Sequence, residues 1–204
     1  EKTDSSFGLL RWKRTLSPDH EISFTASRTR DSGADRFELP VTSDNLVIDY
    51  GRLAVRDSFE YQHFLGLSDQ WRASWGAEYR RDNVQAPQLF NTNQVQRSNS
   101  LRAYTNLEWR PSNNWTFNVG GLLEYDSLAG TQFAPRLVAN WKLTPLHTFK
   151  LGYSDAFRTP SLYEQRADTR FVFQGTTVDI KYLSFGGLNP ETVRTTELAY
   201  LGEW

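Results

Sequence analysis

Apolar and polar residues alternate one by one along most of this 204-residue chain, which is the period of a β-strand. From Leu101 to Trp109 the odd positions read Leu, Ala, Thr, Leu and Trp, and the even positions between them read Arg, Tyr, Asn and Glu. The alternation resumes from Trp115 to Asp126 after a Pro-Ser-Asn-Asn reversal. Successive side chains of a strand point to opposite faces, so each segment has one apolar and one polar face. The pattern therefore predicts an all-β fold, with no helical stripe of useful length.

Nine segments are predicted as strands, and the connections between them are unequal. The strands are 7–16, 21–30, 52–67, 71–82, 98–110, 115–126, 132–143, 148–156 and 192–203. Short reversals occur at 17–20, 68–70, 111–114 and 144–147, and longer connections at 31–51, 83–97, 126–132 and 157–191. In an antiparallel up-and-down sheet, this alternation places all short turns at one end and all long loops at the other. Outer-membrane barrels have that asymmetry.

The aromatic residues are placed as a membrane barrel requires. Near the short reversals, on apolar faces, are Trp12, Trp71, Trp109, Trp115, Trp141 and Phe149, and at the far ends are Tyr79, Tyr125 and Tyr153. Amphipathic rings prefer the level of the lipid headgroups. The pattern favours an antiparallel up-and-down transmembrane β-barrel over a soluble β-sandwich, whose apolar faces would pack between two sheets. Arg14 and Asp57 fall on nominally apolar faces, and a bulge or an interfacial depth would account for each.

Composition excludes several other classes. The net charge of −1 offers no basic stripe for nucleic acid. No run approaches the ~18 apolar residues of a membrane helix, and the mean hydropathy of −0.61 is compatible with alternating barrel strands. Cysteine is absent, and no metal-ligand spacing, phosphate loop or nucleophile motif stands out. We therefore expect no metal site, no cofactor and no enzymatic activity.

Two motifs near the end of the chain resemble signatures of the TonB-dependent outer-membrane receptor family. The first runs from Tyr153 to Glu164 and the second from Gly187 to Tyr200. The residues that match the family's motif positions are Phe157, Arg158, Pro160 and Glu164 in the first motif and Asn189, Pro190, Glu191 and Glu197 in the second. The second motif lacks the family's Pro-x-Leu insert, and Ala199 replaces the usual Gly. The resemblance covers roughly residues 46–204.

The resemblance implies a fold, a location and a function. Residues 1–204 would form part of one β-barrel domain, about nine strands of a barrel of about 22, in the outer membrane of a Gram-negative bacterium. The plug domain and the TonB box, through which the family contacts the TonB complex, are expected to be absent from this chain, which would come from the middle of the barrel. The function implied is energy-coupled uptake of a scarce nutrient, foremost a ferric siderophore. The alternatives are a small self-contained outer-membrane barrel (an adhesin or enzyme) and a soluble β-sandwich binding module.

Candidate functional residues lie in the 157–191 loop and on the polar faces. Cationic and aromatic loop residues could hold an anionic, aromatic iron chelate, or could be ordinary loop residues; they are Arg166, Arg170, Phe171, Phe173, Lys181 and Tyr182. Charges expected to line the lumen are Arg72, Glu78, Arg80, Arg102, Glu108, Arg110, Glu124 and Arg136. Arg158 is expected to anchor the loop base on Glu164 or Glu191, and Pro160 to end the ladder.

Haem is not the expected ligand of this loop. The family's haem receptors carry a ligating His between the two motifs, whereas the three histidines here are His20, His63 and His147. None of them lies between Arg158 and Asn189.

Overall fold

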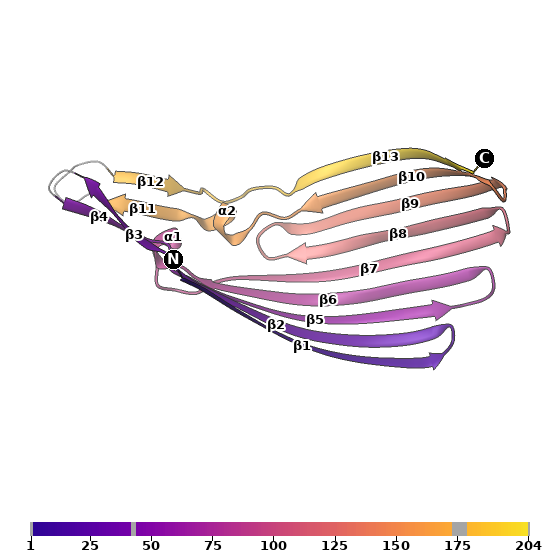
Figure 1. Cartoon of the computed structure of the whole chain (residues 1–204), viewed down its shortest axis with the longest axis horizontal. Coiled ribbons are helices and arrows are strands. Elements are labelled where there is room, and N and C mark those ends of the chain that lie inside the picture. Colours follow the sequence, from indigo (N-terminus) through magenta and orange to yellow (C-terminus); the bar gives the residue numbers. More distant parts are fainter. Residues whose placement is uncertain (1, 42–43, 173–178, 204) are drawn as a thin grey trace.

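The structure is a computed structural model that describes residues 2–41, 44–172 and 179–203, with the backbone alone at 37–39, 41, 44–48, 170–172 and 179–181. Nine of the described strands form one antiparallel sheet in the order β1-β2-β5-β6-β7-β8-β9-β10-β13 (Figure 1). These strands are β1 (Lys2–Ser17), β2 (His20–Ala34), β5 (Arg52–Gly66), β6 (Trp71–Gln85), β7 (Gln96–Ser112), β8 (Trp115–Asp126), β9 (Gly130–Thr144), β10 (His147–Arg158) and β13 (Glu191–Gly202). All nine strands predicted from the alternation are therefore present.

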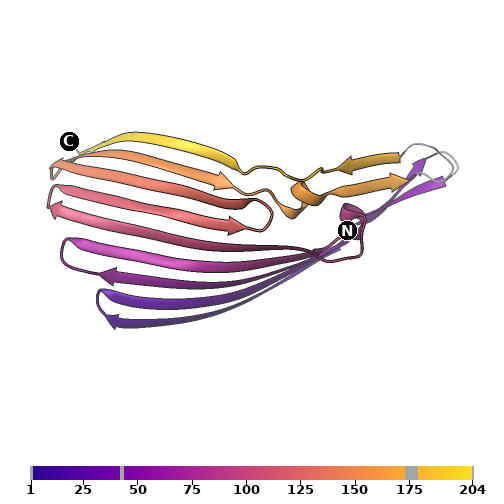
Figure 2. The same cartoon turned by 180° about the vertical axis from the view of Figure 1, so that it is seen from behind.

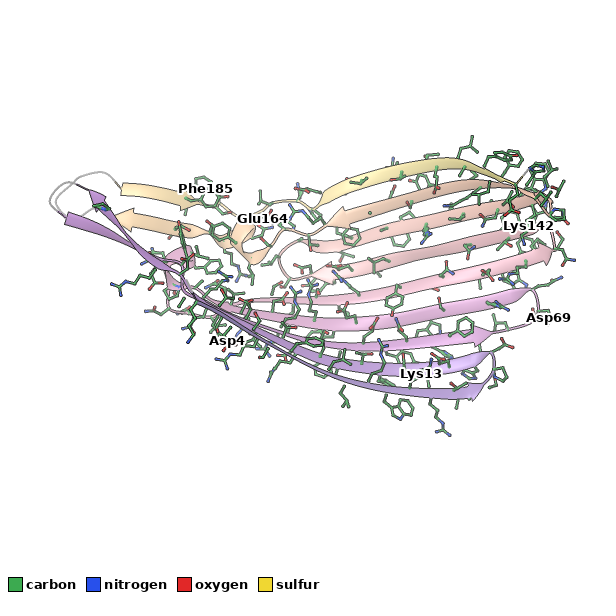
Figure 3. The ribbon with its side chains drawn as sticks, viewed as in Figure 1. Asp4, Lys13, Asp69, Lys142, Glu164 and Phe185 are labelled. Atoms are coloured by element: carbon green, nitrogen blue, oxygen red, sulfur yellow. The ribbon has the colours of Figure 1, made fainter. Side chains whose placement is uncertain are left out.

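The short turns gather at one end of the sheet and the long connections at the other. Figure 1 shows the turns β1–β2, β5–β6, β7–β8 and β9–β10 on the right and the longer segments on the left, and Figure 2 shows the same division from behind. We call these the turn end and the loop end. Asp69 marks the turn end and Glu164 the loop end in Figure 3. The predicted up-and-down arrangement is confirmed.

Strand register keeps like residues together on each face. On the apolar face Leu101 pairs with Tyr79 and with Tyr125, and one position later Arg102 pairs on the polar face with Glu78 and Glu124. Apolar side chains remain exposed, for example Leu10 at 73%, Leu123 at 48% and Leu198 at 80%. Among the described residues no second sheet covers this face, so the structure does not support the soluble β-sandwich alternative, which needs such a layer.

Aromatic rings form a nearly continuous belt across the apolar face at the turn end. Ring centroids lie 4.9–5.9 Å apart along two runs, Trp12–Phe24–Tyr61–Trp75 and Trp71–Trp109–Phe117–Trp115–Trp141–Phe149–Tyr200. All six aromatic residues predicted for this level are members. Amphipathic rings at one level of an exposed apolar face suit the membrane–water interface.

The two charged residues that conflicted with the apolar face are accommodated by depth. Asp57 lies one row beyond Phe59 towards the loop end, where Arg28 donates Nε and Nη2 to its carboxylate at 2.6 and 3.0 Å. Arg14 lies beside the first short turn, opposite Ile22. Both positions are at the margins of the apolar band, so no bulge is needed to explain them.

The long connections contain structure that the alternation does not predict. The described residues include two two-stranded sheets, β3 (Arg36–Val41) with β4 (Asp44–Asp49) and β11 (Asp168–Val172) with β12 (Asp179–Leu183), and the short helices α1 (Pro87–Phe90) and α2 (Leu162–Arg166). A small apolar core of Ala86, Phe90 and Leu162 joins α1 to α2. No helix in the described part of the chain is long and apolar enough to cross a membrane.

Candidate functional site

Arg158 holds the base of the long loop with both carboxylates that its motif placed within reach. Its guanidinium donates to Glu164 through Nη1 and Nη2, each at 3.0 Å, and to Glu191 through Nε at 3.1 Å and Nη2 at 2.8 Å. Arg158 ends β10 and is register partner of Glu191, the first residue of β13. The pairing expected from the sequence is present, and it closes the loop from 159 to 190 at its root.

Glu164 also builds the start of α2. Ser161 Oγ accepts a bond from the Glu164 backbone N–H, and Glu164 Oε2 accepts one from the Ser161 N–H at 2.7 Å, which is a capping box. Arg158, then the Ser161 backbone and side chain, lower the pKa of Glu164 from 4.5 to about 2. Arg158 likewise lowers the pKa of Glu191. Pro160, which is buried, precedes this helix and lacks a donor to continue the ladder.

Gln165 connects α2 to the neighbouring segments. Its amide Nε2 donates to the Leu128 carbonyl at 3.3 Å and to the Leu188 carbonyl at 2.8 Å, and its Oε1 accepts from the Leu188 N–H at 3.2 Å. The side chain is only 6% exposed. Asn189 and Pro190 follow Leu188 directly and lead into β13, so the second motif is held against the first by this side chain.

A second set of contacts joins α2 and β11 to the 86–95 connection. Asn91 Nδ2 donates to Asp168 at 3.1 Å, and Thr169 Oγ1 donates to the Leu89 carbonyl at 3.3 Å. Phe90 packs edge-on against Tyr163. The sequence reasoning missed Phe90 and Asn91, although Pro87 in first-turn position was a readable helix start.

The predicted ligand-contact residues are only partly brought together. Arg166 donates to Gln96 Oε1 at 3.3 Å, and Tyr182 stacks on Tyr163 with ring centroids 5.5 Å apart. The backbones of Arg170 and Lys181 are register partners across β11 and β12, with Phe171 next to Arg170. Phe173 lies outside the described residues. Phe185, which is 95% exposed, is labelled beside β12 in Figure 3.

The polar face presents paired charges in place of a bare basic or acidic patch. Arg102 donates to Glu124 Oε2 at 2.6 Å and lies 3.4 Å from Glu78 Oε2. Glu124 is 1% exposed, and its second oxygen has no hydrogen-bond partner among the described residues. Other ion pairs on this face include Lys13–Glu21, Arg80–Asp82, Arg110–Glu108, Arg56–Asp82 and Lys150–Glu197.

Two hollows lie along the polar face. One of about 530 Å³ is lined by Arg136, Lys150, Ser154 and Glu197 among others, and it extends along β10 towards the loop end. The other, of about 360 Å³, is lined by Pro160 and Leu162 and by charged groups that include Arg80 and Asp126. Mixed charge of this kind suits a polar partner surface or a charged solute.

The described residues contain no cluster of three or more His, Cys, Asp and Glu side chains that could hold a metal ion. His20 and His147 begin strands beside short turns, and His63 contacts His20, with 2.8 Å between the two Nε2 atoms. All three histidines therefore lie near the turn end, far along the strands from the 157–191 loop.

Comparison with known proteins identifies similar sequences and structures. Residues 2–202 match the family model described as TonB dependent receptor-like, beta-barrel. The iron-regulated outer membrane virulence proteins of two Vibrio cholerae serotype O1 strains, O395 and El Tor Inaba N16961, are each 34% identical over 96 residues, which are 46% of this chain and 14% of each relative. The chain thus spans a small part of the curated relatives it matches.

Solved structures share the fold at low sequence identity. The siderophore receptor PirA from Pseudomonas aeruginosa has a TM-score of 0.68 at 16% identity and covers 99% of this chain and 43% of its own. PirA from Acinetobacter baumannii has a TM-score of 0.74 at 14% identity, over 99% of this chain and 33% of its own. FpvA of P. aeruginosa, solved with heterologous pyoverdines, has a TM-score of 0.60 at 11% identity, over 99% and 30% of the two chains.

Proposed function

Because the chain belongs to the TonB-dependent receptor β-barrel family, we propose that it forms part of the wall and loop region of a receptor that imports a ferric siderophore with energy supplied through TonB. The family is one of outer-membrane receptors and transporters, so the chain lies in the outer membrane and is not an enzyme. The turn end faces the periplasm and the loop end faces the outside, as in other barrels of this kind.

The observation that carries the proposal is that the base of the long loop is held by several hydrogen bonds at the loop end of the polar face. Arg158 binds Glu164 and Glu191 at the loop base, and Gln165 ties the two motif segments together. The loop then carries exposed aromatic groups, Tyr182 at 55% and Phe185 at 95%. A ligand caught by these groups is delivered to the entrance of the charged lumen wall.

The chemistry of the loop suits an anionic chelate. Arg166 supplies a guanidinium at the loop end, and Tyr163 and Tyr182 supply a stacked aromatic pair. Cations attract the carboxylate or phenolate oxygens of a chelator, and ring faces stack on aromatic chelating groups. The names of the similar proteins, siderophore receptors and an iron-regulated outer membrane protein, support the same assignment. The positions of the histidines argue against haem as the ligand of this loop.

Uptake of radioactive iron by cells carrying the full-length receptor tests the proposal. The host should lack its own siderophore receptors and be offered ferric siderophores of several chelating classes, haem and cobalamin in turn. We expect uptake of at least one ferric siderophore and neither of the other two. A double variant, Arg166→Gln with Tyr182→Ala, should raise the concentration for half-maximal uptake by roughly 10-fold. Lys142→Gln, at the turn end, is the matched control and should leave uptake unchanged.

Energy coupling is tested in the same cells. Uptake should stop when TonB is deleted or the proton gradient is dissipated, whereas binding of the chelate to the cell surface should persist. Uptake that continues without TonB would contradict the energised mechanism, and transport of haem alone would contradict the siderophore assignment.

A further inference from the structure

An apolar groove runs over the lipid-facing side of the first strands of the sheet. It has a volume of about 390 Å³ and lies over β1, β2, β5, β6 and β7. Its floor is low because Ala26 and Ala77 occupy positions where the neighbouring strands carry Phe59 and Tyr61. The other apolar side chains along it are Leu10, Trp12, Phe24, Tyr79 and Leu101. The groove is a recess in an otherwise bulky apolar wall, wide enough to seat a hydrocarbon chain.

Basic residues border the groove at its loop end. The register places Arg28, Asp57 and Arg81 side by side on β2, β5 and β6, one same-face row beyond Phe59 and Tyr79. The next same-face row holds Arg30 on β2 and Arg97 on β7. Four arginines therefore lie at the level where the apolar band ends, and three of them, Arg28, Arg30 and Arg81, are neighbours of Asp57 in the register.

Most of this positive charge is unused within the described residues. Arg30, Arg81 and Arg97 are exposed and form no side-chain salt bridge there, and Arg28 uses only Nε and Nη2 on Asp57. The Arg28 side chain is 69% exposed. Adjacent strands are ~4.8 Å apart, so the backbones of Arg28 and Arg81 lie roughly 10 Å apart on either side of Asp57. Two long arginine side chains can close this gap and meet on one phosphate group.

We propose that this surface binds one molecule of the phosphorylated glycolipid of the outer leaflet, lipopolysaccharide, with an acyl chain in the groove and a lipid A phosphate on Arg28, Arg30 and Arg81. The apolar groove and the arginine cluster are separate observations, and they meet at the depth where a lipid changes from chain to headgroup. The loop end faces outward, so the leaflet at this level is the one that holds the glycolipid.

Native mass spectrometry of the purified full-length receptor tests the site. Lipid A, dephosphorylated lipid A, phosphatidylglycerol and phosphatidylethanolamine are added in turn to delipidated protein. We expect lipid A to bind with a stoichiometry of one at the lowest concentration. The triple variant Arg28→Gln, Arg30→Gln and Arg81→Gln should bind it roughly 100-fold more weakly, since each basic residue near an anionic surface contributes a factor of about five.

Two matched controls separate the site from general charge effects. Arg14→Gln removes an outward arginine on the same face at the turn end, and Arg194→Gln removes one on β13 away from the groove; both should bind lipid A as the unmodified receptor does. Ala77→Phe fills the groove and leaves the arginines intact, and it should weaken lipid A binding by roughly 10-fold. All variants should retain the siderophore uptake of the parent, so failure of the proposed function and failure of this site are distinguishable.

Three results would overturn the proposal. The first is lipid A binding that is unchanged in both the triple variant and Ala77→Phe. The second is an equal loss in Arg14→Gln or Arg194→Gln. The third is phosphatidylglycerol binding as tightly as lipid A, which would assign the site to a phospholipid.

Discussion

At the scale of single residues, Arg158 carries the attachment of the long loop. Arg158→Ala removes four hydrogen bonds to two carboxylates but leaves the capping box of α2, so α2 should persist while its link to β13 is lost. A spin label on Phe185→Cys, in a segment without other cysteines, should become more mobile, and siderophore affinity should fall roughly 3- to 10-fold. The unfolding temperature should hardly change, because exposed ion pairs contribute only ~0–1 kcal/mol.

The control for this prediction is Arg194→Gln. That residue forms a comparable exposed pair with Asp155 on the neighbouring strand, but it does not touch the loop base. Its spin-label spectrum should match that of the unmodified receptor. A label whose mobility is unchanged in Arg158→Ala would show that the bonds of Gln165 and Ser184 hold the loop without Arg158.

Protonation of Glu164 should release the same attachment in acid. Its pKa is lowered from 4.5 to about 2 in the folded protein, so its contribution to loop stability is fully present above pH 4.5 and is lost as the pH falls towards 2. The Phe185→Cys label should therefore be less mobile at neutral pH than in acid, and its mobility should rise below pH 4.5. In Glu164→Gln the label should show the higher mobility at every pH. An acid transition with the same midpoint in both proteins would assign it to another group.

At the scale of elements, the strands were predictable and the loop structure was not. A period of two is imposed along a whole strand by lipid on one side and a polar lumen on the other, so nine segments could be found without knowing their partners. The hairpins β3–β4 and β11–β12 are outside the membrane and lack that constraint.

In the site, too, the sequence predicted the local contacts and not the long-range ones. The Arg158 pairing follows from a local motif, and the Ser161-x-x-Glu164 spacing of a capping box was a readable but unused signal. By contrast, Gln165 bonds to Leu128 and Leu188, which are 37 and 23 residues away, and such contacts depend on how the loops fold over each other.

The two faces of one strand should differ sharply in their tolerance of charge. Val119 and Asn118 are adjacent on β8, and Val119 lies on the apolar face opposite Leu107 and Leu137. Val119→Arg should destabilise the barrel in liposomes by ~2–4 kcal/mol, the cost of arginine near the bilayer midplane. Asn118→Arg, on the polar face, should cost less than about 1 kcal/mol and is the matched control. Equal losses in the unfolding temperature would mean that β8 does not face lipid.

At the scale of the whole molecule, the register sets the inclination of the strands. Each short turn is displaced along the strand direction relative to the turn before it. The first residue after a turn pairs with a residue near the end of the next strand in the sheet, and that strand continues past the pair. The pairs are His20–Leu65, Trp71–Trp109 and Trp115–Trp141, and the strands that continue are β5, β7 and β9. The shift is roughly one residue per strand, and with a rise of ~3.3 Å and a spacing of ~4.8 Å it corresponds to a tilt of about 35°. Closed membrane barrels have this tilt. The same tilt accounts for the staggered turns and for an aromatic belt that stays at one level across the strands.

The open edges of the sheet lead to a prediction about the segment expressed alone. In the described structure β1 and β13 are the outermost strands and do not pair with each other, so each presents a row of backbone N–H and C=O groups. Lipid offers these groups no hydrogen bonds, and an open edge is not tolerated in the hydrocarbon region. Residues 1–204, refolded without the rest of a receptor, should therefore aggregate or pair edge to edge with other copies instead of inserting as a monomer. Gel mobility before and after heating, with protease protection in liposomes, measures this, and the full-length receptor is the control. A protease-resistant, heat-modifiable monomer of residues 1–204 would mean that β1 and β13 can close on each other and that nine strands suffice for a barrel.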